Sequence, residues 1–131
     1  MRQRSQTETA IRLLREAREL ITPFGKWCWG AVAQNSKGED TSPTDRSACK
    51  WCAEGALHFV EHRWKTEAAE LTDIVLLREL DASAEASVDD EFCIVDVNDG
   101  NVYQAPDEDR HKAVLACYDH TIERLEKTLD A

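Results

Sequence analysis

Residues 42–64 read SPTDRSACKWCAEGALHFVEHRW. The first four, Ser-Pro-Thr-Asp, are typical of a helix start, because their side chains cap free backbone N–H groups and proline suits the first turn. The apolar residues that follow form a wide stripe at helical spacing, which predicts a central helix ending near Trp64. Gly55 costs such a helix about 1 kcal/mol relative to alanine, so we expect it to mark the close approach of another element. The stripe comprises Ala48, Cys49, Trp51, Cys52, Ala56, Leu57, Phe59, Val60 and Trp64.

Three further helices and a little β structure are expected around this helix. Ser5 and Glu8 resemble a capping box for the first helix, and the Asn35–Gly38 stretch is a turn signal inside a β-hairpin. The fold class expected is mainly α, a compact four-helix single domain over residues 1–131. Helices are expected at residues 7–21, 66–82 and 107–128, the hairpin at 28–41, a loop at 83–90, and at 92–97 a short strand or, alternatively, one or two helical turns.

Length and composition limit the classes of function. A chain of 131 residues fits one domain of about 100–200 residues. Its formal net charge of −10 repels nucleic acid and anionic membranes, so neither is an expected partner. The chain has five cysteines, an odd number, and begins without a secretory signal, which favours reduced thiols in the cytoplasm. No complete catalytic constellation can be assembled, so we expect neither an enzyme nor a bound cofactor.

Several short motifs carry a resemblance to a known family. Residues 27–33 read WCWGAVA, residues 51–57 read WCAEGAL, and Asn98-Asp99 precedes the last helix. This arrangement resembles a family of small uncharacterised bacterial and phage proteins. The resemblance implies a compact domain found in phage or other mobile-element settings, and it implies no activity. Asn98 and Asp99 themselves are expected to hold a turn through their own backbone.

Cys49 and Cys52 form a CxxC motif. In redox proteins the first such cysteine lies at a helix N-terminus, which lowers its thiol pKa. Here both cysteines are expected one turn inside the central helix, so two core thiols on adjacent turns are the simpler interpretation. A thiol-redox role remains an alternative.

His58 and His62 lie four residues apart on the same helix. With Glu61 they spell the inverted zinc-protease motif HxxEH, which still needs a third ligand and a substrate cleft. On one continuous helix these histidines face away from Cys49 and Cys52, so all four could share a zinc ion only if the helix broke between the pairs. We therefore expect no metal site, with His58 and His62 as the weak alternative.

Charge is distributed very unevenly along the chain. Residues 67–109, here called the acidic segment, contain fourteen acids and one base, whereas residues 1–21 contain five arginines and three glutamates. Such a density of like charge destabilises a fold by self-repulsion. The concentration of acids in this segment is explained either by a face exposed to solvent or by binding to a basic partner. The expected partner-binding residues are Glu67, Glu70, Asp73, Glu85, Asp89, Asp90, Glu91, Asp107, Glu108 and Asp109.

The leading functional hypothesis is a small, non-enzymatic binding protein that docks its acidic segment on a basic, nucleic-acid-binding protein surface. By imitating phosphate spacing, a phage-borne protein of this kind would inhibit a host nuclease or immune complex. Two alternatives stay open. One is a metal or thiol protein that uses His58, His62 and the CxxC motif. The other is a structural or homodimerising protein with Trp27, Trp29 or Trp64 on an exposed apolar patch.

Overall fold

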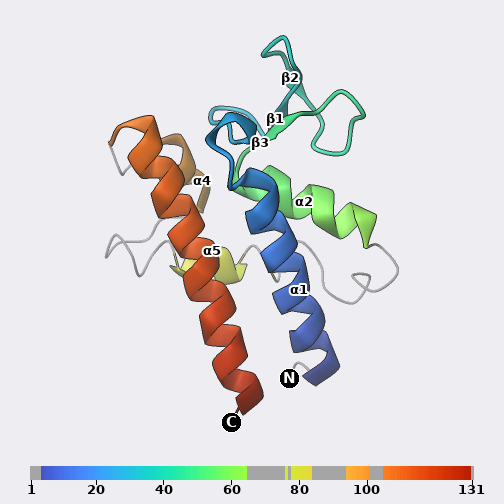
Figure 1. Ribbon diagram of the computed structural model, residues 1–131, viewed down its shortest axis with the longest axis vertical. Coiled ribbons are helices and arrows are strands. Elements are labelled where there is room, and N and C mark those ends of the chain that lie inside the picture. The colour runs from blue at the N-terminus through green and yellow to red at the C-terminus, as the bar shows by residue number, and fades with distance from the viewer. Residues whose placement is uncertain (1–3, 65–75, 77, 84–93, 101–104, 131) are drawn as a thin grey trace.

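Two long helices run side by side in opposite directions and contribute much of the core (Figure 1). They are α1, Arg4–Ile21, and α5, Asp107–Asp130. The helices predicted at 7–21 and 107–128 are therefore confirmed, with small differences at their ends. The computed structural model describes residues 4–64, 76, 78–83, 94–100 and 105–130. Within them α1 already contains Arg4 and Ser5, so the expected capping box of Ser5 and Glu8 lies inside the helix.

Leucine and small side chains make the helix–helix contact possible. Leu13, Leu14 and Ala17 of α1 and Val114 and Cys117 of α5 are all buried in one apolar cluster. Burying an aliphatic side chain of this size stabilises a fold by about 1.5–3 kcal/mol. The polar rim of the same contact carries ion pairs, which are described below.

Helix α2, Ala53–Arg63, packs on α1, and Leu57 and Val60 are its largest core residues. The central helix was expected to begin near Asp45, and this prediction was wrong by about two turns. Lys50–Trp51 forms a strand, β3, and Cys52 caps the helix that follows. Asp45 instead closes a local turn by accepting hydrogen bonds from the Ser47 backbone N–H and hydroxyl.

A small antiparallel sheet lies at one end of the molecule (Figure 1). Its middle strand is β1, Ala33–Gln34, which pairs with β2, Asp40–Thr41, and with β3. The Asn35 side-chain oxygen accepts hydrogen bonds from Lys37 N and Glu39 N and closes the β1–β2 turn. The hairpin was expected at this place, and β3 was not expected.

Gly55 marks the place where α2 meets the sheet. A Cβ at this position would lie 2.0 Å from the carbonyl oxygen of Val32, which accepts a hydrogen bond from Cys52 N. The expected close approach of another element at Gly55 is therefore confirmed. The neighbouring element is the chain entering β1.

Residues 94–99 form a short helix, α4, so of the two alternatives expected for 92–97 the helical turns, and not the strand, are found at the described positions. Ile94 and Val97 are both buried, and their spacing of three places them on one helical face. The Asp81 side chain accepts a hydrogen bond from Ile94 N at 2.8 Å and so satisfies a free N–H of the first turn. Residues 92 and 93 lie outside the described residues.

The remaining expectations fall partly outside the described chain. Residues 78–83 are helical, including Ser83, which had been assigned to a loop. The rest of the predicted 66–82 helix, apart from Leu76, and of the 83–90 loop is not described. Together with the 3-10 turn η1, Phe24–Lys26, the described residues are mainly helical with a small sheet. Among the described helices, none is long and apolar enough to cross a membrane.

Candidate functional site

The side chain of Asn98 joins three distant parts of the chain at the end of α4. It is fully buried, and its Oδ1 accepts hydrogen bonds from Trp27 Nε1 at 2.7 Å and from Ala53 N at 2.9 Å. Its Nδ2 donates to the Cys28 carbonyl oxygen at 3.0 Å. Buried polar groups need such partners, because an unmade hydrogen bond costs about 1–3 kcal/mol. Asn98 therefore fixes the segment before β1, the start of α2 and the end of α4 relative to one another.

Asp99 extends this network toward the surface. Its Oδ1 accepts hydrogen bonds from Gly30 N at 3.0 Å and from Asn98 Nδ2 at 3.0 Å. Gly30 has a φ of +75°, a conformation that glycine adopts without steric cost. The expectation that Asn98 and Asp99 hold only their own turn was wrong, because their side chains bind residues about 45–70 positions away.

Arg110 closes the network from the first turns of α5. Its guanidinium donates to the Asn98 carbonyl oxygen at 3.1 Å and forms an ion pair with Asp107. The Arg110 Cζ atom lies 5.7 Å from the ring centroid of Trp27 and 5.4 Å from that of Trp29, within cation–π range. Arg110 is 6% exposed, so a buried cation is held by a carbonyl, a carboxylate and two indole rings.

The sequence interpretation missed Arg110 altogether. Its signal was present, since Arg110 lies four residues before Val114 on the buried face of α5. A charged residue at an inward position is almost never buried without a partner. That position could have pointed to an internal carboxylate or carbonyl partner.

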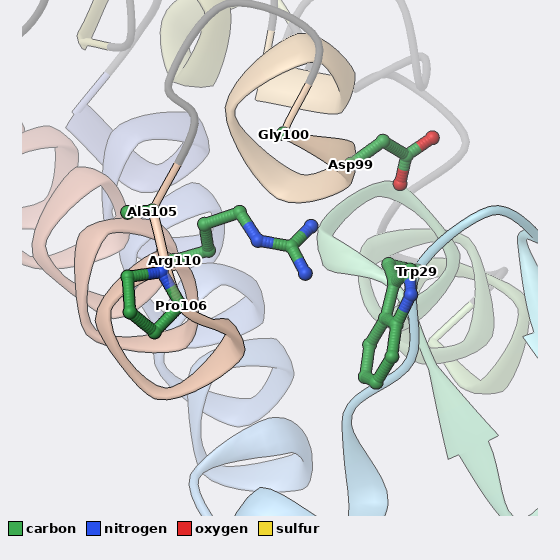
Figure 2. Close-up of a pocket in the computed structure, with 6 residues that line it drawn as sticks. All are labelled: Trp29, Asp99, Gly100, Ala105, Pro106 and Arg110. Atoms are coloured by element: carbon green, nitrogen blue, oxygen red, sulfur yellow. The ribbon is translucent and has the colours of Figure 1, made fainter.

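A surface pocket of about 450 Å³ opens beside Arg110. Figure 2 shows the guanidinium reaching toward Trp29, with Asp99 to one side and Pro106 to the other. Gly100 passes directly over the arginine, and a Cβ there would lie 3.0 Å from its Nη1. The pocket is lined by Trp29, Asp99, Gly100, Ala105, Pro106 and Arg110.

Three large apolar side chains of the described residues are exposed, and one of them, Trp29, lines this pocket. Phe24, Trp29 and Val32 are 44%, 42% and 40% exposed, whereas Trp27 between them is buried. The Trp27 ring lies 6.0 Å from Phe24 and 5.2 Å from Trp29, measured between centroids. Of the three tryptophans expected at an exposed patch, Trp29 lies in one and Trp64 is half-buried.

The CxxC cysteines are not on one helix. Cys49 precedes β3, and Cys52 is the N-cap of α2, where its Sγ accepts a hydrogen bond from Gly55 N at 3.3 Å. Although this is a helix N-terminus, burial raises the pKa of the Cys52 thiol to about 11. Burial raises the pKa of Cys28 to about 12. Burial thus favours the protonated form of both Cys52 and Cys28. Of the two motif cysteines that were expected in the core, Cys52 is buried and Cys49 is half-buried.

His58 and His62 lie on α2, as expected, but they do not share an environment. His58 is half-buried, and its Nε2 lies 3.3 Å from Glu54 Oε1, whereas His62 is exposed. In the part of the chain that the structure describes, no three histidine, cysteine or carboxylate side chains gather closely enough to hold a metal ion. The expectation that the histidines face away from Cys49 and Cys52 assumed one continuous helix. That assumption was wrong, because residues 50–51 form a strand.

Three of the ten expected partner-binding acids lie in the first turn of α5, where negative charge stabilises the positive end of the helix dipole. Asp107 is half-buried against Arg110, whereas Glu108 and Asp109 are exposed. The other seven lie outside the described residues: Glu67, Glu70, Asp73, Glu85, Asp89, Asp90 and Glu91.

The motifs that suggested a family resemblance meet in this network. Residues 27–33, the start of α2 and Asn98-Asp99 are joined by the hydrogen bonds of Asn98 and Asp99. No curated protein and no solved structure matches the chain. A family model described as a family of unknown function, DUF6197, matches residues 5–124. Because this match covers most of the chain, the protein belongs to the DUF6197 family.

Proposed function

We propose that this protein is a non-enzymatic binding protein whose acidic segment docks on a basic protein surface. The observation that carries the proposal is the charge of residues 67–109, which hold fourteen acids and one base. Opposite potentials steer partners together and select a complementary surface. The natural target for such a field is a protein surface that otherwise binds nucleic acid phosphates.

The ion pairs between the long helices support this proposal. Arg18 binds Asp119, with Nε 2.6 Å from Oδ1, and Arg15 pairs with Glu126. Both acids lie on α5 beyond the acidic segment. Arg15 and Arg18, two of the five arginines in residues 1–21, therefore neutralise acids outside residues 67–109.

The described end of the acidic segment also presents its charge outward. Glu108 and Asp109 are exposed at the N-terminal end of α5, which lies far from both chain termini (Figure 1). Asp99 lies at this same end, beside Arg110 and Asp107. We therefore include this end of the molecule in the proposed docking surface.

The mechanism proposed is competition with nucleic acid for a basic groove. Carboxylates at intervals comparable to phosphates would occupy the lysine and arginine side chains of the target. The binder would then act as an inhibitor of a host nuclease or immune complex, as suits a phage-encoded protein. Its association would be fast at low ionic strength and would weaken steeply with salt.

Two variants with equal net charge test this proposal. The first neutralises four acids of the segment, as Glu85→Gln, Asp89→Asn, Asp90→Asn and Glu91→Gln. The second neutralises four exposed acids outside it, as Glu8→Gln, Glu19→Gln, Glu123→Gln and Asp130→Asn.

The two variants are compared by affinity capture from a host lysate at about 50 mM and 500 mM salt. Exposed charges become screened over this range. The wild type and the second variant should retain a basic protein at low salt, and high salt should release it. The first variant should retain at least tenfold less. Equal capture by both variants, or capture that salt does not weaken, contradicts the proposal.

The exposed apolar residues favour a second candidate function, self-association. Phe24, Trp29 and Val32 are 44%, 42% and 40% exposed, and apolar patches on monomers mark contact sites. Sedimentation equilibrium over a hundredfold range of concentration tests this. A homodimer that Val32→Ser dissociates supports a dimerising role, and a monomer throughout removes it.

A further inference from the structure

Trp29 is an exposed aromatic residue beside the N-terminal end of α5. It is 42% exposed, although its ring centroid lies 5.2 Å from that of Trp27 and 5.4 Å from the Arg110 Cζ atom. The depression that Trp29 lines with Asp99 and Arg110 is open to solvent, unlike the enclosed sites that small ligands occupy. Exposed tryptophans of this kind are common anchors in protein–protein interfaces.

Asp99 brings a carboxylate next to Trp29. Its Oδ1 accepts a hydrogen bond at 3.0 Å from the backbone N–H of Gly30, the residue that follows Trp29. Figure 2 shows this carboxylate turned away from the Arg110 guanidinium. In the described part of the chain no basic side chain forms an ion pair with Asp99, whereas Arg110 is paired with Asp107. The charge of Asp99 is therefore not compensated by the described residues.

The first turn of α5 adds to this negative charge. Immediately before Arg110 it carries three acids, two of which are exposed: Asp107, Glu108 and Asp109. Residues 99–110 thus contain four acids and one base. Lys112, the next base, lies about 200° around the helix from Arg110 and so points to a different side of α5. The surface around Trp29 is therefore complementary to a positively charged partner.

An arginine side chain matches both the indole and the carboxylates. Its guanidinium is planar, is more weakly hydrated than an ammonium group, stacks on aromatic rings and pairs with carboxylates through two parallel hydrogen bonds. The lysine ammonium is a compact, strongly hydrated charge without a flat face. Arg110 and Trp29 already make such a contact within the chain.

We propose that Trp29 is the anchor of the docking surface and receives an arginine side chain of the basic partner. The guanidinium packs on the exposed part of the indole, and Asp99 and the acids of the first turn of α5 balance its charge. This inference rests on the proposed function, because it names the contact by which a basic surface is recognised. It adds a preference for arginine over lysine, which charge alone does not provide.

Two peptides of equal charge test this preference, acetyl-Gly-Arg-Gly-Arg-Gly-amide and its lysine counterpart. Each is titrated into the full chain at about 50 mM salt, where exposed charges are weakly screened, and binding is followed by ¹H–¹⁵N NMR. The arginine peptide should shift the indole N–H signal of Trp29. It should bind about threefold more tightly than the lysine peptide, as expected for a cation–π contact at an exposed site.

Substitution of Trp29 tests the same contact from the side of the protein. Trp29→Ser should bind the two peptides equally, and in capture from a host lysate it should retain about fivefold less basic protein. Phe24→Ser is the matched control. Phe24 is similarly exposed, at 44%, but it is not among the described residues that line the depression with Asp99. This variant should keep both the arginine preference and the captured protein.

Three results would overturn the proposal. One is the absence of saturation at about 10 mM arginine peptide, a Kd beyond the millimolar range. Another is a wild type that binds both peptides equally, or a preference that Trp29→Ser retains. The third is a dimer that Trp29→Ser dissociates, with a Trp29 indole signal that neither peptide shifts, because a second copy of the chain then occupies this surface.

Failure of this contact is distinguishable from failure of the proposed function. If Trp29→Ser captures the basic protein as well as the wild type does, and the variant neutralised at Glu85, Asp89, Asp90 and Glu91 does not, acidic docking stands and the arginine anchor is wrong. If the variant with four neutralised acids captures normally, docking through the acidic segment is wrong whatever the peptides show.

Discussion

At the scale of single residues, Asn98 is the position on which the site depends. One carboxamide accepts from Trp27 and Ala53 and donates to Cys28. The sequence indicated that Asn98-Asp99 mattered, because the pair carried the family resemblance. It could not indicate the partners, since an Asn-Asp-Gly string is equally typical of an ordinary turn. Arg110 is hard to predict for a related reason, because a helical pattern of apolar residues gives no weight to a charged residue on the buried face.

Replacing Asn98 by alanine should lower the free energy of unfolding by about 3 kcal/mol. The truncation leaves the Trp27 indole N–H, the Ala53 N–H and the Cys28 carbonyl buried without their partner, and each such group costs about 1–3 kcal/mol, part of which water entry recovers. Urea unfolding followed by circular dichroism measures the change. A loss below about 0.5 kcal/mol, the usual range of surface substitutions, would show that Asn98 does not hold these segments.

Stability should also fall at alkaline pH because of Cys28. Burial raises the pKa of its thiol from 9.0 to about 12, so the fold favours the protonated form. The corresponding stability is fully present below pH 9.0 and is lost as the pH rises toward about 12, because the unfolded chain releases the proton first. Urea unfolding at pH 8, 9.5 and 10.5 should therefore show a steeper decline for the wild type than for Cys28→Ala. Parallel declines would exclude this contribution.

At the scale of elements, the long helices were predictable and the short ones were not. α1 and α5 carry an amphipathic pattern over many turns, which leaves little ambiguity. Ala48, Cys49, Trp51 and Cys52 follow a helical apolar pattern, yet Lys50 and Trp51 form β3 because Gln34 and Ala33 offer their backbone groups. Ile94–Asp99 is rich in β-branched residues, yet it forms a helix capped by Asp81. In both cases a tertiary contact overrides the local preference.

Gly55→Ala should destabilise the protein even though alanine is the better helix former. The added Cβ would lie 2.0 Å from the Val32 carbonyl oxygen, so α2 must move away from the sheet. Overpacking of this kind costs about 1–3 kcal/mol or more, which exceeds the gain of about 1 kcal/mol in helix propensity.

Gly25→Ala is the matched control for this prediction. Nothing lies within 4 Å of a Cβ at Gly25, so its free energy of unfolding should change by less than about 0.5 kcal/mol. Equal effects of the two substitutions in thermal or urea unfolding would contradict the close contact at Gly55.

At the scale of the whole molecule, net charge was readable from composition, but its arrangement was not. The sequence gives −10 overall and places fourteen acids in residues 67–109. It does not show that Arg15 and Arg18 are paired with Glu126 and Asp119 on another helix. Only the packing of α1 against α5 reveals that these arginines are engaged away from the acidic segment.

Added salt should stabilise this protein. Self-repulsion among the acids favours expansion, and about 0.5 M NaCl screens it over distances beyond a few ångströms. We expect Tm to rise by about 4–8 °C, corresponding to roughly 1 kcal/mol for a domain of about 100 residues. The variant with Glu85, Asp89, Asp90 and Glu91 neutralised should respond less. A Tm that is unchanged or lower in salt would show that the acids do not repel one another appreciably.

The carboxamide of Asn98 has a consequence for the order in which the molecule opens. Because a single oxygen receives both the Ala53 amide proton and the Trp27 indole proton, withdrawing α4 deprives both of their acceptor at the same moment. The first turn of α2 and the segment before β1 thus lose these hydrogen bonds together, although the chain between them forms all three strands of the sheet. Local unfolding of either segment alone is therefore disfavoured, and we expect the two segments to unfold locally as one cooperative unit.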